Sequence, residues 1–231
     1  MTGTPGWGAP TDMAEPRVLR FSRTERAVHW VHATAFLLLL ASGLCLYLPV
    51  LSELVGRRGL FKAIHVYTAA AWLAALTLVV LLGNRRRLRA TVREIELLQE
   101  GRFNRGQMLN AVATAAFAVL FTVTGALLWL GERDTRFRFA NTLLIHDWLM
   151  YVSVILFAGH LFLAVRFRHS INGMVRGWVR EDWARRHHPL WDAREDDRRG
   201  VHAPGRVVQH GGGGERGADA GRAGAVRRAG P

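Results

Sequence analysis

Long apolar stretches of this 231-residue chain carry histidines within them or at their start. His146 and His160 lie in one stretch, fourteen residues apart, and His29 and His65 each stand at the head of another. Ionisable side chains at membrane depth are costly and usually have a function. Because imidazoles on facing helices of a bundle are natural axial ligands of haem iron, the pattern predicts a membrane cytochrome b.

The apolar stretches are each long enough to cross a hydrocarbon core about 30 Å thick. They cover approximately residues 27–48, 63–82, 108–130 and 143–165. So many in one short chain favour a membrane protein over buried helices of a soluble one. We therefore expect an all-α membrane protein with an up-and-down bundle of four transmembrane helices. This diheme domain would span residues 17–195, between a flexible N-terminus (1–16) and a disordered Gly/Arg-rich tail (196–231).

The segments between and after the apolar stretches also carry patterns. Leu88, Val92 and Ile95 recur at helical spacing among charged residues, which predicts a short amphipathic surface helix that Gly101 ends. Residues 166–195 are basic and rich in tryptophan, and we expect partly ordered helix there, against the membrane surface or a partner.

The net charge of +13 could indicate a nucleic-acid partner, but its placement argues against one. The basic residues precede the first stretch, fill the segment between the second and third, and follow the fourth. By the positive-inside rule, both termini and the middle loop are cytoplasmic, as in a multi-pass protein of the bacterial inner membrane. Cys45 is the only cysteine, so this chain alone can form neither an internal disulfide nor an iron–sulfur cluster.

Helix geometry sorts the histidines into two pairs. Fourteen residues advance about 21 Å along a helix and return to within about 40° of the starting direction, so His146 and His160 share a face at two depths. His65 starts its stretch on the outer side, level with His146, and His29 starts on the inner side, level with His160. His32 lies one turn further into the membrane and could replace His29. The predicted iron ligands are therefore His65 with His146 and His29 with His160.

Two other features bear on this prediction. Gly43, Gly125 and Gly159 would allow close approach of a helix or a flat macrocycle, although ordinary helix packing also favours small residues. Zinc is another possible occupant of clustered histidines, but the two on the fourth stretch are too far apart to share one ion.

At these residues the sequence resembles the cytochrome b (gamma) subunit of membrane-bound respiratory formate dehydrogenase, over about residues 17–195. The motifs that carry the resemblance are Arg26-Ala27-Val28-His29-Trp30, His65, Asn104-Arg105-Gly106-Gln107, the His146/His160 pair, Glu181-Asp182-Trp183 and His187-His188-Pro189-Leu190-Trp191.

The resemblance implies two b haems, held by the pairs above. It implies an iron–sulfur subunit as electron donor, fed by a molybdenum- or tungsten-pterin subunit that oxidises formate, which this chain itself does not. It also implies that Asn104, Gly106 and Gln107 bind menaquinone or ubiquinone, the electron acceptor, beside the haem of His160. A turn followed by a helix start would explain the same three residues without a quinone.

Other functions remain open at this point. Diheme subunits of hydrogenases and thiosulfate reductases use similar scaffolds. A haem-free membrane anchor would need none of the histidines. A stand-alone transmembrane reductase or transporter could use them for proton relay.

Overall fold

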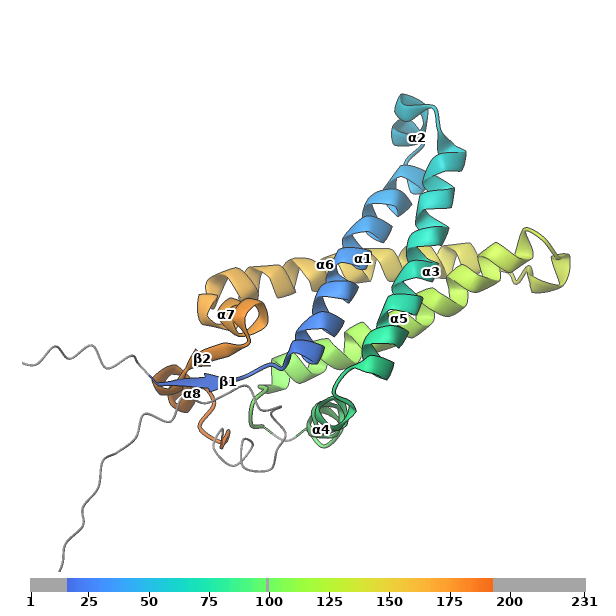
Figure 1. The fold of residues 1–231 in the computed structure, drawn as a ribbon. Coiled ribbons are helices and arrows are strands. Elements are labelled where there is room, and N and C mark those ends of the chain that lie inside the picture. Colours follow the sequence, from blue (N-terminus) through green and yellow to red (C-terminus); the bar gives the residue numbers. More distant parts are fainter. Residues whose placement is uncertain (1–15, 99, 193–231) are drawn as a thin grey trace, which may run out of the picture.

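The computed structural model describes residues 16–98 and 100–192 (Figure 1). Four long helices dominate it: α1 (Arg23–Tyr47), α3 (Arg58–Leu82), α5 (Arg105–Gly131) and α6 (Thr142–Arg166). The flexible N-terminus and the disordered tail predicted above lie outside the described residues, apart from Pro16.

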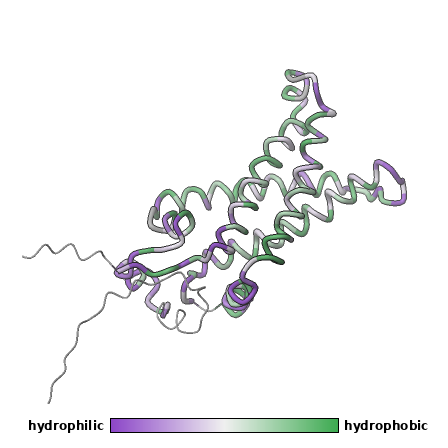
Figure 2. The backbone as a smooth tube through the Cα atoms, viewed as in Figure 1, coloured by the Kyte–Doolittle hydropathy of each residue, from purple (hydrophilic) through white to green (hydrophobic). Residues whose placement is uncertain are grey.

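Each long helix is apolar and long enough to cross a membrane, with mean hydropathy between 1.7 and 2.1. Figure 2 shows hydrophobic residues along most of their length, and many of their large apolar side chains are exposed. The four predicted transmembrane helices are thus confirmed, and each begins somewhat before its apolar stretch. For α1 the reason is a capping box: Ser22 accepts from the Glu25 backbone N–H, and the Glu25 carboxylate accepts from that of Ser22.

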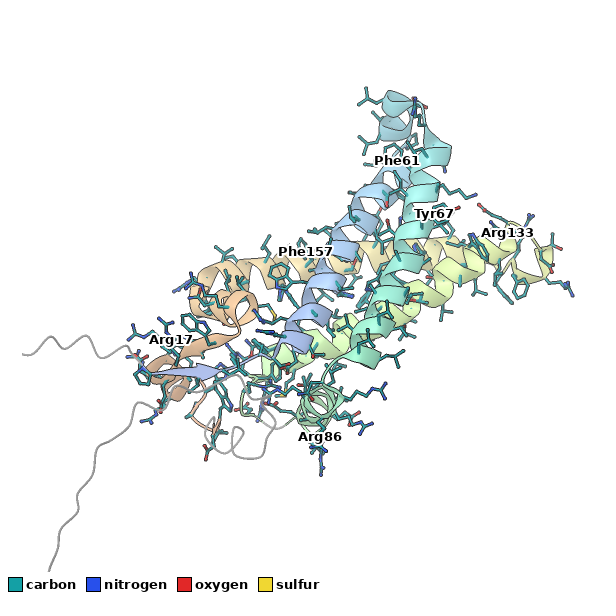
Figure 3. All side chains as sticks on the ribbon, in the orientation of Figure 1. Arg17, Phe61, Tyr67, Arg86, Arg133 and Phe157 are labelled. Carbon is teal, nitrogen blue, oxygen red and sulfur yellow. The ribbon has the colours of Figure 1, made fainter. Side chains whose placement is uncertain are left out.

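The long helices form two hairpins, because α1 packs on α3 and α5 packs on α6. Figure 1 shows the two hairpins crossing and diverging at their far ends. There α2 (Pro49–Val55) connects the first hairpin and η1 (Thr135–Phe137) lies in the connection of the second. We call this side the loop end; Arg133 marks it in Figure 3. The hairpins are joined by the Tyr151–Tyr47 hydroxyl hydrogen bond of 2.5 Å and the Lys62–Glu132 ion pair of 2.6 Å.

The opposite side, the capped end, carries the remaining elements. They are β1 (Arg17–Leu19), α4 (Arg85–Glu96), α7 (Arg168–Arg176), β2 (Trp178–Arg180) and α8 (Glu181–His187). Strands β1 and β2 pair antiparallel, with Val18 opposite Val179, over a small core of Val179, Trp183 and Ala184. The sequence predicted partial helix here but neither strand, since three residues are too few to show a period-two pattern.

The predicted amphipathic helix is present as α4, which Asn84 caps by accepting from the Arg87 N–H. It ends at Glu96, before Leu98, whose φ of 48° is left-handed. Gly101 therefore does not end this helix, contrary to the sequence prediction. A non-glycine residue held in this region costs on the order of 1–3 kcal/mol, which the surrounding structure must offset.

A buried ionic network holds α4 to the start of α1. The Glu25 carboxylate pairs with Arg102 at 2.7 Å and Arg87 at 3.1 Å, and both arginine side chains are 2% exposed. Thr91 donates to the same carboxylate at 2.5 Å, and the Arg20 carbonyl accepts from both guanidinium groups. Because buried charges are stable only when paired and hydrogen-bonded, Glu25 fixes the geometry of the capped end.

Candidate cofactor sites

The structure contains two pairs of histidines, and in each pair a histidine of one hairpin faces a histidine of the other. His65 of α3 lies opposite His146 of α6, and His29 of α1 lies opposite His160 of α6. In both pairs the ring centres are 6.3 Å apart. These are the two pairings predicted from the sequence.

This separation suits two ligands of one metal. With a metal–nitrogen bond of about 2 Å and about 1.1 Å from the nitrogen to the ring centre, two axial imidazoles place their ring centres about 6.2 Å apart. Within residues 16–98 and 100–192, no group of three or more His, Cys, Asp or Glu side chains could hold a metal ion. Two imidazoles suffice where a porphyrin supplies the other four ligands, so this donor set fits haem.

The two pairs lie at different depths of the bundle. Helix α6 is continuous from Thr142 to Arg166, so His146 and His160 are about 21 Å apart along its axis. His65 lies in the first part of α3, at the loop end, and His29 lies near the start of α1, at the capped end. Haems held at these two levels would stack between the faces of a membrane.

His32, the alternative to His29, points to a different neighbour. Its ring centre is 5.5 Å from that of Trp72 on α3, and Trp72 is buried. The structure brings His29, rather than His32, to His160.

Two hydroxyl residues that the sequence analysis did not single out contact the pair at the loop end. Ser42 Oγ of α1 lies 3.0 Å from His65 Nδ1, and Thr124 Oγ1 of α5 lies 2.8 Å from His146 Nδ1. Both hydroxyl residues are buried. The signal for them in the sequence is a Ser-Gly pair in one apolar stretch and a Thr-Gly pair in another.

Those glycines lie against the histidine rings. A Cβ on Gly43 would be 3.4 Å from His65 Cε1, and one on Gly125 would be 3.6 Å from His146 Cε1. A side chain longer than alanine at either position would therefore crowd the ring. Gly159 has no neighbour within 4 Å of such a Cβ among the described residues. A close approach of a neighbouring helix's side chain thus occurs at Gly43 and Gly125, and the expectation of a flat macrocycle against Gly159 stays a prediction.

Asn104, Gly106 and Gln107 lie together at the start of α5, at the capped end. Asn104 Oδ1 accepts from the Gln107 N–H at 2.9 Å, and Gln107 Oε1 accepts from the Asn104 N–H at 3.2 Å. This capping box is the helix start that the sequence also allowed. Within the described ranges, no hydrogen bond or ring contact joins these residues to His29 or His160.

Arg20 connects this loop to the cap. Its Nη2 donates to Gln107 Oε1 at 3.2 Å and to the Arg102 carbonyl at 3.0 Å, and lies 3.0 Å from His188 Nε2. Burial, together with the Arg102 charge, lowers the Arg20 pKa to about 10. Burial and the Arg20 charge lower the pKa of His188 to about 4, so His188 is neutral at pH 7.

The family model for prokaryotic cytochrome b561 matches residues 20–177. The chain belongs to the prokaryotic cytochrome b561 family. The match covers all four long helices and both histidine pairs. Membership of this cytochrome b561 family, with the four apolar helices, makes the chain a multi-pass membrane protein of a family that binds haem b.

Several curated proteins are similar over most of their length. The cytochrome b556(fdo) subunit of formate dehydrogenase from Escherichia coli K12 is 28% identical over 75% of this chain and 91% of its own. The formate dehydrogenase cytochrome b556 subunit of Haemophilus influenzae is 24% identical over 77% of this chain and 83% of its own length. The cytochrome b556(Fdn) subunit of the nitrate-inducible formate dehydrogenase of E. coli K12 is 24% identical over 75% of this chain and 89% of its own length. The resemblance predicted from the motifs is confirmed.

Proposed function

We propose that this cytochrome b561 family member is the membrane subunit of a formate dehydrogenase-type respiratory complex. In this role it passes electrons from an iron–sulfur subunit to quinone. The observation that carries the proposal is the pair of histidine sites, each with ring centres 6.3 Å apart, in a chain similar to three formate dehydrogenase cytochrome b subunits. As in the sequence analysis, formate would be oxidised on a separate molybdenum- or tungsten-pterin subunit.

The iron ligands in this proposal are His65 with His146 and His29 with His160. Each pair takes one histidine from each hairpin, so the ligands would also tie the hairpins together. When bound, two b haems would supply one-electron transfer between the two levels. The chain positions the imidazoles and surrounds them with apolar helix, which controls dielectric and solvent access.

The charge distribution sets the proposed orientation. The capped end carries the arginine-rich helix α4, with Arg86 marked in Figure 3, and the basic segment after α6. By the positive-inside rule this end is cytoplasmic and the loop end is periplasmic. The iron–sulfur subunit would then dock at the loop end, nearest the His65/His146 site, and the chain would lie in the bacterial inner membrane.

Quinone would bind at the capped end, beside Asn104, Gly106 and Gln107. Both amide oxygens are used in the capping box and point to backbone N–H groups. Their NH2 groups donate no hydrogen bond within the part of the chain that the structure describes. These donors can therefore serve the carbonyl oxygens of menaquinone or ubiquinone. Reduction of quinone on this side, with uptake of cytoplasmic protons, would move charge across the membrane.

The test is haem quantification of the purified full-length chain by reduced-minus-oxidised spectroscopy. We expect two b haems per chain, and one after His65→Ala or His146→Ala, because each variant removes one ligand of the same site. His29→Ala should likewise leave one haem, whereas His32→Ala, the matched control, should leave two.

Three results would contradict the proposal at different points. A wild-type chain without haem would support the bare-anchor function instead. Two haems in both the His65 and His146 variants would refute that pair. Loss of a haem in His32→Ala, with retention in His29→Ala, would move the inner ligand to His32.

A further inference from the structure

The two histidine sites differ in what lies behind their rings. Both histidines at the loop end have a buried hydroxyl at hydrogen-bonding distance from Nδ1: Ser42 at 3.0 Å from His65 and Thr124 at 2.8 Å from His146. Within residues 16–98 and 100–192, neither ring of the His29/His160 pair has a hydrogen-bond partner. The asymmetry runs along the axis between the two ends of the bundle.

The helix carbonyls decide which way each hydrogen bond runs. Ser42 Oγ–H donates to the Leu38 carbonyl at 2.7 Å, and Thr124 Oγ1–H donates to the Leu120 carbonyl at 2.7 Å. A hydroxyl has one proton and two lone pairs, so each oxygen, having donated once, accepts from the imidazole. This arrangement favours the tautomer of each histidine with its proton on Nδ1, which leaves the Nε2 lone pair to bind iron.

The same arrangement occurs in both hairpins. In each, one helix presents a hydroxyl residue followed by glycine, Ser42-Gly43 on α1 or Thr124-Gly125 on α5, to a histidine on the other helix. The glycine allows the ring to lie close, and the hydroxyl then meets Nδ1. Such an outer hydrogen bond orients a ligating imidazole and raises its basicity.

We propose, on the basis of the function above, that Ser42 and Thr124 are positioning residues that lower the midpoint potential of the haem at the loop end. A more basic imidazole donates more charge to iron and stabilises the ferric state over the ferrous state. The haem at the capped end, whose ligands lack such partners among the described residues, would keep a higher potential. Electrons entering at the loop end would then move downhill to the capped end, which helps them move inward against a membrane potential that is negative inside.

The size of the effect follows from the behaviour of outer hydrogen bonds at metal sites. Loss of such a partner typically changes metal affinity by about 10- to 100-fold. If the affinity of the site for ferric haem alone falls about tenfold, the midpoint potential of a one-electron couple rises by about 59 mV. Ser42→Ala and Thr124→Val should each produce a rise of about this size. Both must shift the same haem, because His65 and His146 share it.

The experiment is potentiometry of the purified full-length chain, with both haems resolved, in wild type and in each variant. Low-spin ferric electron paramagnetic resonance provides a second measure, since loss of the hydrogen bond should move the g values of one haem only. The matched control is Thr122→Val on the same helix as Thr124. Among the described residues its hydroxyl contacts only the Ala118 carbonyl, at 2.7 Å, so this variant should shift neither haem.

The conservative variant Thr124→Ser retains the hydroxyl and should retain the wild-type potential and g values. This comparison remains decisive if Thr124→Val assembles poorly, and Ser42→Ala probes the same haem from the other ligand. Two haems with unchanged potentials in both Ser42→Ala and Thr124→Val would overturn the inference and leave the proposed function intact. Shifts in two different haems would overturn it too. Absence of haem from the wild-type chain would instead overturn the proposed function.

Discussion

The capped end gives the strongest prediction about stability, through Glu25. We expect Glu25→Gln, which retains the size of the side chain but removes its charge, to destabilise the protein strongly. The carboxylate faces Arg87 and Arg102, which are both 2% exposed, and Glu94 would remain to pair with Arg102. Removing one partner of a buried ion pair costs about 3–5 kcal/mol, because the remaining charge stays buried.

That cost converts into a measurable shift. For a protein of this size, 1 kcal/mol moves the unfolding midpoint by about 2–4 °C, so Tm should fall by roughly 6–20 °C. The assay is thermal unfolding in detergent followed by tryptophan fluorescence, because Trp183 lies in the small core of the cap. Asp134→Asn is the matched control, since Asp134 pairs at 2.8 Å with an exposed Arg136 and its loss should leave Tm unchanged. Equal midpoints for the two variants would show that Glu25 does not hold the capped end together.

Two further predictions concern the same end of the bundle. Asn104→Ser keeps a capping oxygen but removes the amide N–H groups, so quinone reduction should slow by about fivefold, the value of one hydrogen bond of about 1 kcal/mol. Haem content should not change. The control is Asn84→Ser, which alters the cap of α4 in the same way and should leave the rate of quinone reduction unchanged. An unaltered rate of quinone reduction in Asn104→Ser would refute the proposed quinone site. His188 has a native pKa of about 4, below its ordinary 6.5, so the unfolded state binds more protons between these values. Stability should therefore fall as the pH drops from about 6.5 to about 4, a slope that His188→Gln should reduce; an equal slope in both proteins would contradict the assignment.

The sequence predicted the spans and the histidine pairs because both depend on local, periodic signals. An uninterrupted apolar stretch must form a helix in lipid, and helix geometry then fixes the depth and face of His146 and His160. The start of α1 lies outside its apolar stretch because hydrogen bonding at Ser22, rather than hydropathy, begins that helix.

The rest depended on contacts between distant segments. Thr124 is one of several small residues that lie within two positions of one another in the sequence, and only the packing of α5 on α6 brings it to His146. Charge patterns predicted a membrane topology, but they could not show that Arg87 and Arg102 turn inward to share one carboxylate. Strand β1 precedes the first span and β2 follows the last, so no short window of sequence contains both strands of this pairing.

The position of β1 in the chain has a consequence for biogenesis. Its partner strand, β2, is synthesised only after the last span, and the Gly177 carbonyl that accepts from the backbone N–H groups of Arg20 and Phe21 comes equally late. Residues Arg17–Leu19 therefore cannot pair until all four long helices have been synthesised. Closure of this small sheet thus requires synthesis of all four long helices, and a product truncated before residue 178 would leave Arg17–Leu19 without their partner strand and open to proteolysis.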